Sequence, residues 1–119
     1  MREEQIRVLM FRPQEDAVEM IIENELDSLQ NAVGGFIECI SPFNDMEVDL
    51  VCNEEGKLMG LKPNRYLSDR KTKANYDLLV GNFFLVSYDD EGNFKSLSDE
   101  QIDKIMSEHR VTISTVWFQ

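Results

Sequence analysis

The chain contains few of the residues that give small proteins special chemistry: two cysteines, one histidine, one tryptophan and three prolines among 119 residues. Two cysteines are too few for the disulfide framework of a small secreted domain. A zinc site takes about four ligands, which Cys39, Cys52 and His109 do not supply, so we expect no metal and no cofactor. His109, near the end of an expected helix, is a poor catalytic base. No residue is therefore predicted to be catalytic, and an enzyme is not indicated.

Long apolar runs are also missing. The run at 83–86 is far shorter than the roughly 20 residues that a membrane-spanning helix requires. The first twelve residues are charged and alternating, unlike a signal peptide. We therefore expect a cytoplasmic protein without membrane contact. The length and the hydrophobic fraction of 42% predict one packed domain over residues 1–119.

Basic residues are scarce relative to acidic ones, 12 against 23, which gives a net charge of −11. This balance disfavours direct binding to nucleic acid, because phosphate contacts depend on clustered lysine and arginine. Two interpretations of the acidity remain open. The carboxylates serve solubility, or the surface imitates a polyanion, as a DNA mimic does, and occupies a basic partner protein.

The two cysteines lie in expected strands, 36–40 and 47–52, which we predict to pair as a hairpin. Alternation places Cys39 and Cys52 on matching faces. Free buried thiols fit better than a bridge, because free cysteine packs as a small hydrophobic residue.

Periodicity predicts an α+β fold with an antiparallel-dominated sheet of about five to seven strands and two helices packed on one face. The expected strands are 4–12, 17–22, 36–40, 47–52, 83–88 and 94–97. One helix follows Asn24 as its N-cap and ends at Gly34-Gly35, where one glycine takes the left-handed conformation. The other begins at a capping box formed by Ser98 and Gln101, and is expected to bury Met106.

Three segments have weaker patterns. Residues 62–74 resemble a loop and carry five of the twelve basic residues with one acid, Asp69. Residues 78–80 are ambiguous. The β-branched and aromatic segment 111–118 is either a last strand or a surface that docks on a partner, so a monomer and a homodimer both remain open.

The segment VCNEEGKLMGLKPNR, residues 51–65, raises the question of a binding site. The simplest interpretation is a hairpin turn with Gly56 at positive φ. Its residues do not match a phosphate-binding loop, a calcium loop or a catalytic carboxylate pair. We expect Arg65 to return to Glu54 or Glu55 as an ion pair.

Four stretches in this order carry a resemblance: IRVLMFRP (6–13), VGGFIECI (33–40), VCNEEGKLMGLKPNR (51–65) and GNFFLVSYDDEGNFKSLSDEQI (81–102). They resemble domain-of-unknown-function family 3846, small uncharacterised proteins of phages, mobile elements and Gram-positive gut bacteria. The resemblance implies a cytoplasmic accessory protein and brings no known activity. The matching positions that backbone geometry does not explain are the predicted binding residues, with Lys57 beside them: Asn53, Glu54, Glu55, Lys57, Asn64 and Arg65.

Two functions follow as expectations. The first is a non-enzymatic interaction module, a phage or mobile-element accessory protein that binds a host protein through its acidic surface. The alternative is a small-ligand binding protein that captures a nucleotide or metabolite with the loop around Arg65.

Overall fold

The computed structural model describes residues 2–109 and 113–115, which form two helices and nine strands. In chain order these are β1 (Gln5–Phe11), β2 (Val18–Glu23), α1 (Leu26–Val33), β3 (Ile37–Ile40), β4 (Val48–Asn53), β5 (Pro63–Ser68), β6 (Asn75–Val80), β7 (Phe83–Tyr88), β8 (Phe94–Lys95), α2 (Asp99–Glu108) and β9 (Ile113–Thr115). No helix in these described ranges is long and apolar enough to cross a membrane.

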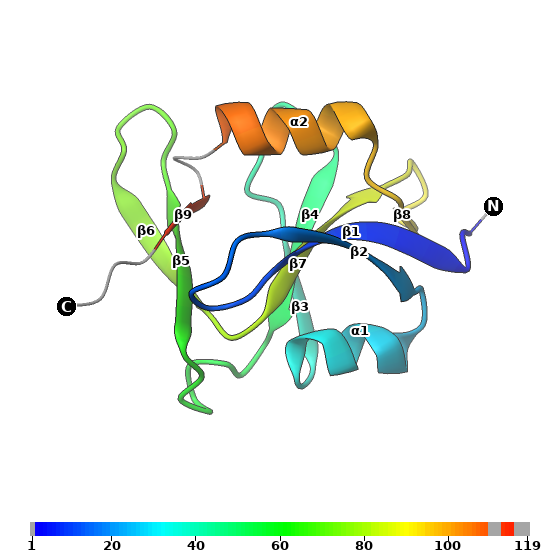
Figure 1. Cartoon of the computed structure of the whole chain (residues 1–119), viewed down its shortest axis with the longest axis horizontal. Coiled ribbons are helices and arrows are strands. Elements are labelled where there is room, and N and C mark those ends of the chain that lie inside the picture. The colour runs from blue at the N-terminus through cyan, green and yellow to red at the C-terminus, as the bar shows by residue number, and fades with distance from the viewer. Residues whose placement is uncertain (1, 110–112, 116–119) are drawn as a thin grey trace.

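The strands form two antiparallel sheets. The larger has six strands in the order β2-β1-β7-β4-β3, with β8 on β7, and the smaller has the order β6-β5-β9. The predicted α+β class with antiparallel strands is confirmed. The strands form two sheets instead of the predicted single sheet, because β5 pairs with β6 and β9 rather than with β4. The chain therefore leaves the large sheet after β4 (Figure 1).

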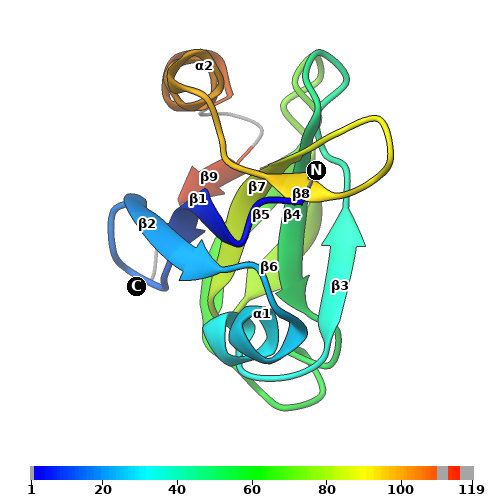
Figure 2. The same ribbon diagram turned by 90° about the vertical axis from the view of Figure 1, so that its right-hand side faces the viewer.

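The large sheet is covered on both faces. Helix α2 lies on one side and α1 on the other (Figures 1 and 2), so the expectation that both helices share one face is wrong. Strand β7 shows why: Phe83 and Leu85 join the cluster that contains α2, whereas Phe84 and Val86 join the cluster that contains α1. A strand buried on both faces is a continuous apolar run, which alone does not reveal how helices are distributed.

The segment 62–74 is not a loop throughout, because β5 occupies its first half. Asn64, Arg65 and Ser68 are polar residues of this strand that are 1%, 7% and 3% exposed. Each of these side chains forms hydrogen bonds within the protein. Burial of polar residues removes the apolar alternation by which a strand is recognised.

The helix ends were predicted with mixed success. The N-cap of α1 is Glu25, without a side-chain bond, rather than Asn24. Asn24 is 4% exposed and instead donates its side-chain N–H to the Glu3 carbonyl at 2.9 Å. Of the two glycines expected to end α1, Gly34 takes the left-handed conformation, at φ 81°. The capping box of α2 at Ser98 and Gln101 is also confirmed, although Met106 is 48% exposed rather than buried.

The β3–β4 hairpin is confirmed, but its cysteines do not share a face. Cys39 lies opposite Val51, and Cys52 opposite Glu38, so the two thiols point to opposite sides of the sheet. Both are free; Cys39 is exposed and only Cys52 is buried. Burial, and next the adjacent Glu38 carboxylate, raises the pKa of Cys52 to about 12, so this thiol stays protonated at neutral pH.

The predicted last strand is confirmed for residues 113–115, which pair with β5 as β9. The remaining positions of the predicted segment, 111–112 and 116–118, lie outside the described residues. The expected docking surface there therefore stays a prediction.

Candidate functional site

The predicted binding residues fall into separate places. Asn53, Glu54, Glu55 and Lys57 belong to the end of β4 and the turn after it, which connects the two sheets and is not a hairpin. Asn53 organises this turn, since its Oδ1 accepts from the Glu55 N–H at 2.8 Å and its Nδ2 donates to the Val33 carbonyl at 3.2 Å. Glu54 and Glu55 are exposed, and Lys57 pairs with Asp77 at 2.6 Å.

The glycine of this turn is needed for space, not for a left-handed backbone. Gly56 is not among the glycines with positive φ; Gly60 takes that conformation, at 69°. A Cβ on Gly56 would lie 2.9 Å from Cγ2 of Val80. The hairpin prediction failed here because the turn has to bring the chain against β6 rather than back along β4.

Arg65 does not pair with Glu54 or Glu55. Its Nη1 donates to Oδ1 of Asn64 at 2.8 Å, and its Nη2 donates to the Glu15 carbonyl at 2.6 Å. Asn64 in turn donates to the carbonyls of Phe11, at 3.0 Å, and Gly81, at 2.7 Å. These two predicted binding residues therefore join β5 to the large sheet through bonds within the protein.

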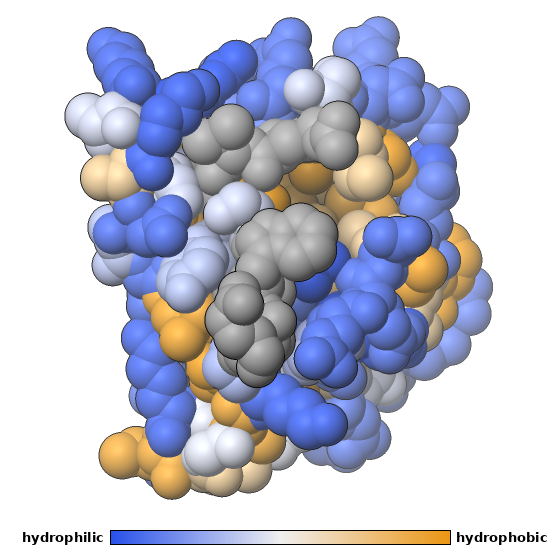
Figure 3. Space-filling model, turned by 60° about the vertical axis from the view of Figure 1, so that its left-hand side comes forward, coloured by the Kyte–Doolittle hydropathy of each residue, from blue (hydrophilic) through white to orange (hydrophobic). Residues whose placement is uncertain are grey.

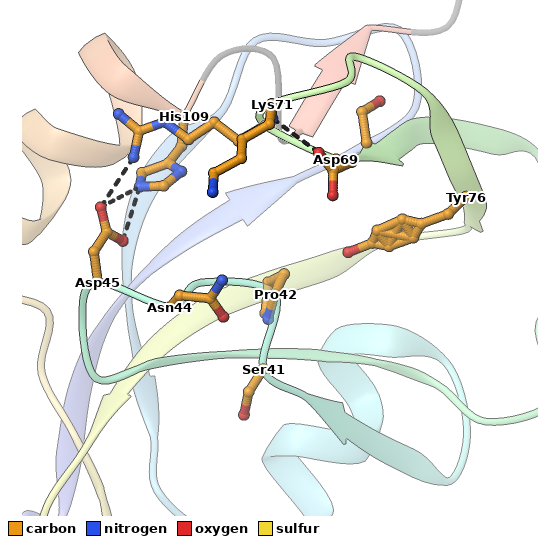
Figure 4. A pocket seen from close by; sticks show the side chains of 10 residues that line it. Ser41, Pro42, Asn44, Asp45, Asp69, Lys71, Tyr76 and His109 are labelled. Carbon is orange, nitrogen blue, oxygen red and sulfur yellow. Dashed lines mark hydrogen bonds and ion pairs between the residues drawn. The ribbon is translucent and has the colours of Figure 1, made fainter.

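A different group of polar side chains surrounds a cavity of about 560 Å³ (Figure 4). It lies between the loop before β4, the turn between β5 and β6, and the end of α2. Its lining residues are Ser41, Pro42, Asn44, Asp45, Ser68, Asp69, Arg70, Lys71, Tyr76 and His109.

Asp45 holds one wall of this cavity together. Its carboxylate lies 3.1 Å from Nε2 of His109, 3.1 Å from Nη1 of Arg70 and 3.3 Å from Nζ of Lys104. Burial raises the pKa of Asp45, but the adjacent Lys104 and His109 outweigh this and hold the pKa below its ordinary value of 3.8. Asp45 is therefore ionised at neutral pH and ties α2 to both loops.

Three donors project into the space beside that wall. Figure 4 shows Lys71 and Tyr76 extending toward it from opposite sides, with Asn44 below. Within residues 2–109 and 113–115, no ion pair or side-chain hydrogen bond is formed by the Lys71 ammonium, the Tyr76 hydroxyl or the Asn44 amide. Burial raises the pKa of Tyr76, as do Asp77 and Asp69, so its hydroxyl is protonated and can donate.

The carboxylate of Asp69, on the same turn as Lys71, is held by backbone hydrogen bonds. Its Oδ1 accepts from the backbone N–H groups of Lys71, at 2.9 Å, and Thr72, at 2.8 Å. These bonds, with that of Thr72 first, lower the pKa of Asp69. The turn thus fixes the backbone of Lys71, whose ammonium has no partner among the described residues.

A metal is a second chemical possibility at the edge of the cavity. Ligand atoms of Asp45, Glu108 and His109 lie within 4.8 Å of one another. However, Arg70 bridges Asp45 and Glu108 at 3.1 and 3.8 Å, and Lys104 adds a second cation. These cations already neutralise the carboxylates, so this donor set fits ion pairing better than a divalent ion.

Sequence reasoning missed Asn44, Asp45 and Tyr76 and gave His109 no role. The basic composition of 62–74 was the one useful signal, because it contains Arg70 and Lys71. The other residues come from distant parts of the chain and meet only through the pairing of β5 with β6 and the docking of α2.

The protein is thus a small α+β protein with two antiparallel sheets and a polar cavity near the end of α2. Residues 6–110 match the family named Domain of unknown function (DUF3846). Because the match covers nearly the whole chain, the protein belongs to this family. No curated protein and no solved structure matches the chain.

Proposed function

We propose that the protein binds a small phosphorylated ligand, of which a nucleotide is the best example, in the cavity lined by Lys71 and Tyr76. One observation carries the proposal: the Lys71 ammonium, the Tyr76 hydroxyl and the Asn44 amide face the same cavity, and none has a partner among the described residues. An ammonium is a common phosphate ligand in proteins, and neutral donors beside it add orientation.

The aromatic ring favours a nucleotide over a simple phosphate. Tyr76 is 57% exposed, so its ring offers a face on which a base can stack. The cavity volume of about 560 Å³ lies within the range of small-molecule sites. The net charge of −11 opposes an anion at long range. We therefore expect modest affinity, with a Kd of about 10 to 1000 µM.

Removing the Lys71 side chain should weaken this binding. We expect Lys71→Ala to raise the Kd for AMP at least about tenfold, which corresponds to about 1.4 kcal/mol. Isothermal titration calorimetry with AMP and with inorganic phosphate measures the change. Tyr76→Leu should weaken AMP more than inorganic phosphate, because it removes the hydroxyl donor for both ligands but the stacking face for AMP alone.

Lys62→Ala is the matched control. It removes the same charge from an exposed lysine that lines none of the cavities described. If it weakens AMP as much as Lys71→Ala does, the effect is one of net charge and the assigned cavity is wrong. Absence of saturable binding of both probes up to about 10 mM would exclude the proposed function.

A second candidate function is the binding of a host protein, in keeping with a mobile-element accessory role. The turn after β4 favours it, because Leu58 is 87% exposed and Met59 55% exposed beside the exposed carboxylates of Glu54 and Glu55. Apolar side chains with a charged border are typical of a recognition surface for a basic partner.

Photo-crosslinking in cells tests this second candidate. A crosslinking residue in place of Leu58 should give one discrete product. The same residue in place of Ile21, which is 61% exposed on β2, should give none. Glu54→Gln with Glu55→Gln should reduce the product if the carboxylates contribute. Equal products at both positions, or none at position 58, would contradict a partner at this turn.

A further inference from the structure

The charge on Arg65 is buried without an ion pair of its own. The residue is 7% exposed. Within the described ranges, no carboxylate oxygen lies within 4.0 Å of its guanidinium nitrogens, the distance that defines a salt bridge. Its bonds go instead to the backbone carbonyls of Asn64 and Glu15 and to the Asn64 side chain. Burial lowers the pKa of Arg65. A buried cation held only by neutral acceptors is one that an added anion stabilises.

The guanidinium has a donor left for such an anion. The bonds just described use Nη1 and Nη2 and leave Nε without a partner in the described part of the chain. No enclosed side-chain nitrogen or oxygen among those residues lacks a partner. Nε of Arg65 is therefore not fully enclosed, and its N–H is a donor that a planar carboxylate can use.

The space beside Arg65 is a cavity of about 390 Å³, distinct from that of Lys71 apart from a shared wall at His109. Its other walls are mainly apolar: Phe11, Ala17, Ile105, Met106 and Ile113. The Phe11 ring is stacked on Phe83 at 4.8 Å, and the guanidinium of Arg65 lies 5.4 Å from its centroid. On the face brought forward in Figure 3, hydrophobic side chains are exposed among hydrophilic ones.

A second charge lies at the same cavity. Asp16 is exposed and lines it, close enough for its charge to oppose the effect of burial on Arg65. It forms neither a salt bridge nor a side-chain hydrogen bond among the described residues. A carboxylate that is not engaged by the nearby guanidinium can receive a ligand ammonium instead.

We propose that this cavity is a binding site for an α-amino acid with an apolar side chain. The carboxylate of the ligand accepts from Arg65, its ammonium meets Asp16, and its side chain packs between Phe11, Ile105 and Met106. The site thus differs from that of the phosphorylated ligand in its residues and in its ligand class, and neither proposal depends on the other.

Three probes that share one apolar body test the assignment by calorimetry: L-leucine, 4-methylpentanoate, which lacks the ammonium, and 3-methylbutylamine, which lacks the carboxylate. We expect L-leucine to bind saturably and at least about tenfold more tightly than either of the others. Asp16→Asn should abolish the preference of the protein for L-leucine over 4-methylpentanoate, and Arg65→Lys should weaken both carboxylates.

Asp27→Asn is the control for Asp16→Asn, because it makes the same change at an exposed position on α1 away from the cavity. It should leave all three affinities unchanged, as should Lys71→Ala. Should Arg65→Lys fail to fold, Asp16→Asn still decides, since Asp16 is exposed. The proposal is overturned if L-leucine shows no saturable binding up to about 10 mM, or if it binds no better than 4-methylpentanoate.

Discussion

Replacing Asn64 with aspartate should lower the free energy of unfolding by about 3–5 kcal/mol. The Asn64 side chain is 1% exposed, and its amide donates to the carbonyls of Phe11 at 3.0 Å and Gly81 at 2.7 Å. An aspartate would place one acceptor oxygen against both carbonyls, and Arg65, whose Nη1 lies 2.8 Å from Oδ1 of Asn64, would offset only the burial of its charge. The change therefore removes two bonds between β5 and the large sheet and replaces them with repulsion.

Urea denaturation of the two proteins measures this difference as a shift of the midpoint at constant slope. Asn44→Asp is the matched control, because Asn44 is exposed and its side chain forms no hydrogen bond among the described residues. We expect that variant to differ from the wild type by less than about 0.5 kcal/mol. A cost at Asn64 below about 1 kcal/mol would show that the amide is not the link between the sheets.

The elements that the sequence predicted well are those in which local chemistry agrees with the final packing. The side chains of Ser98 and Gln101 each accept the backbone N–H of the other residue and so cap α2. Four adjacent residues therefore suffice to locate the helix start. The apolar run of β7 is buried whichever strands lie beside it. Strand β5 was missed because the side chains of Asn64 and Arg65 donate hydrogen bonds to distant backbone carbonyls. No local sequence pattern predicts such bonds.

The same distinction applies to the sites. A basic segment can be read from composition, and it does include Arg70, Lys71 and Arg65. All three line a cavity, but tertiary structure decides which is engaged: the fold uses Arg70 to hold Asp45 and leaves Lys71 without an ion pair in the described part of the chain. Tyr76, the aromatic residue near Lys71, and Asp16, the acid near Arg65, come from segments that no local pattern links to the basic segment.

Gly81→Ala should lower the free energy of unfolding by about 2–4 kcal/mol, the second large effect that we expect. Gly81 has φ 72°, a conformation that costs alanine about 1 kcal/mol. In addition, a Cβ there would lie 2.6 Å from Cδ1 and 3.3 Å from Cβ of Leu61. Moving the chain away would disturb the bonds of Gly81 to Lys62, at 2.7 Å, and to Asn64.

Gly92→Ala separates the two contributions. Gly92 has φ 82°, but a Cβ added there meets nothing within 4 Å. Its substitution should therefore cost only the backbone strain, about 1 kcal/mol. The excess at Gly81, measured by the same urea titration, then reports the crowding against Leu61. Equal costs at the two glycines would mean that Leu61 moves aside freely, and that the contact between the start of β7 and the chain before β5 contributes little to holding the two sheets together.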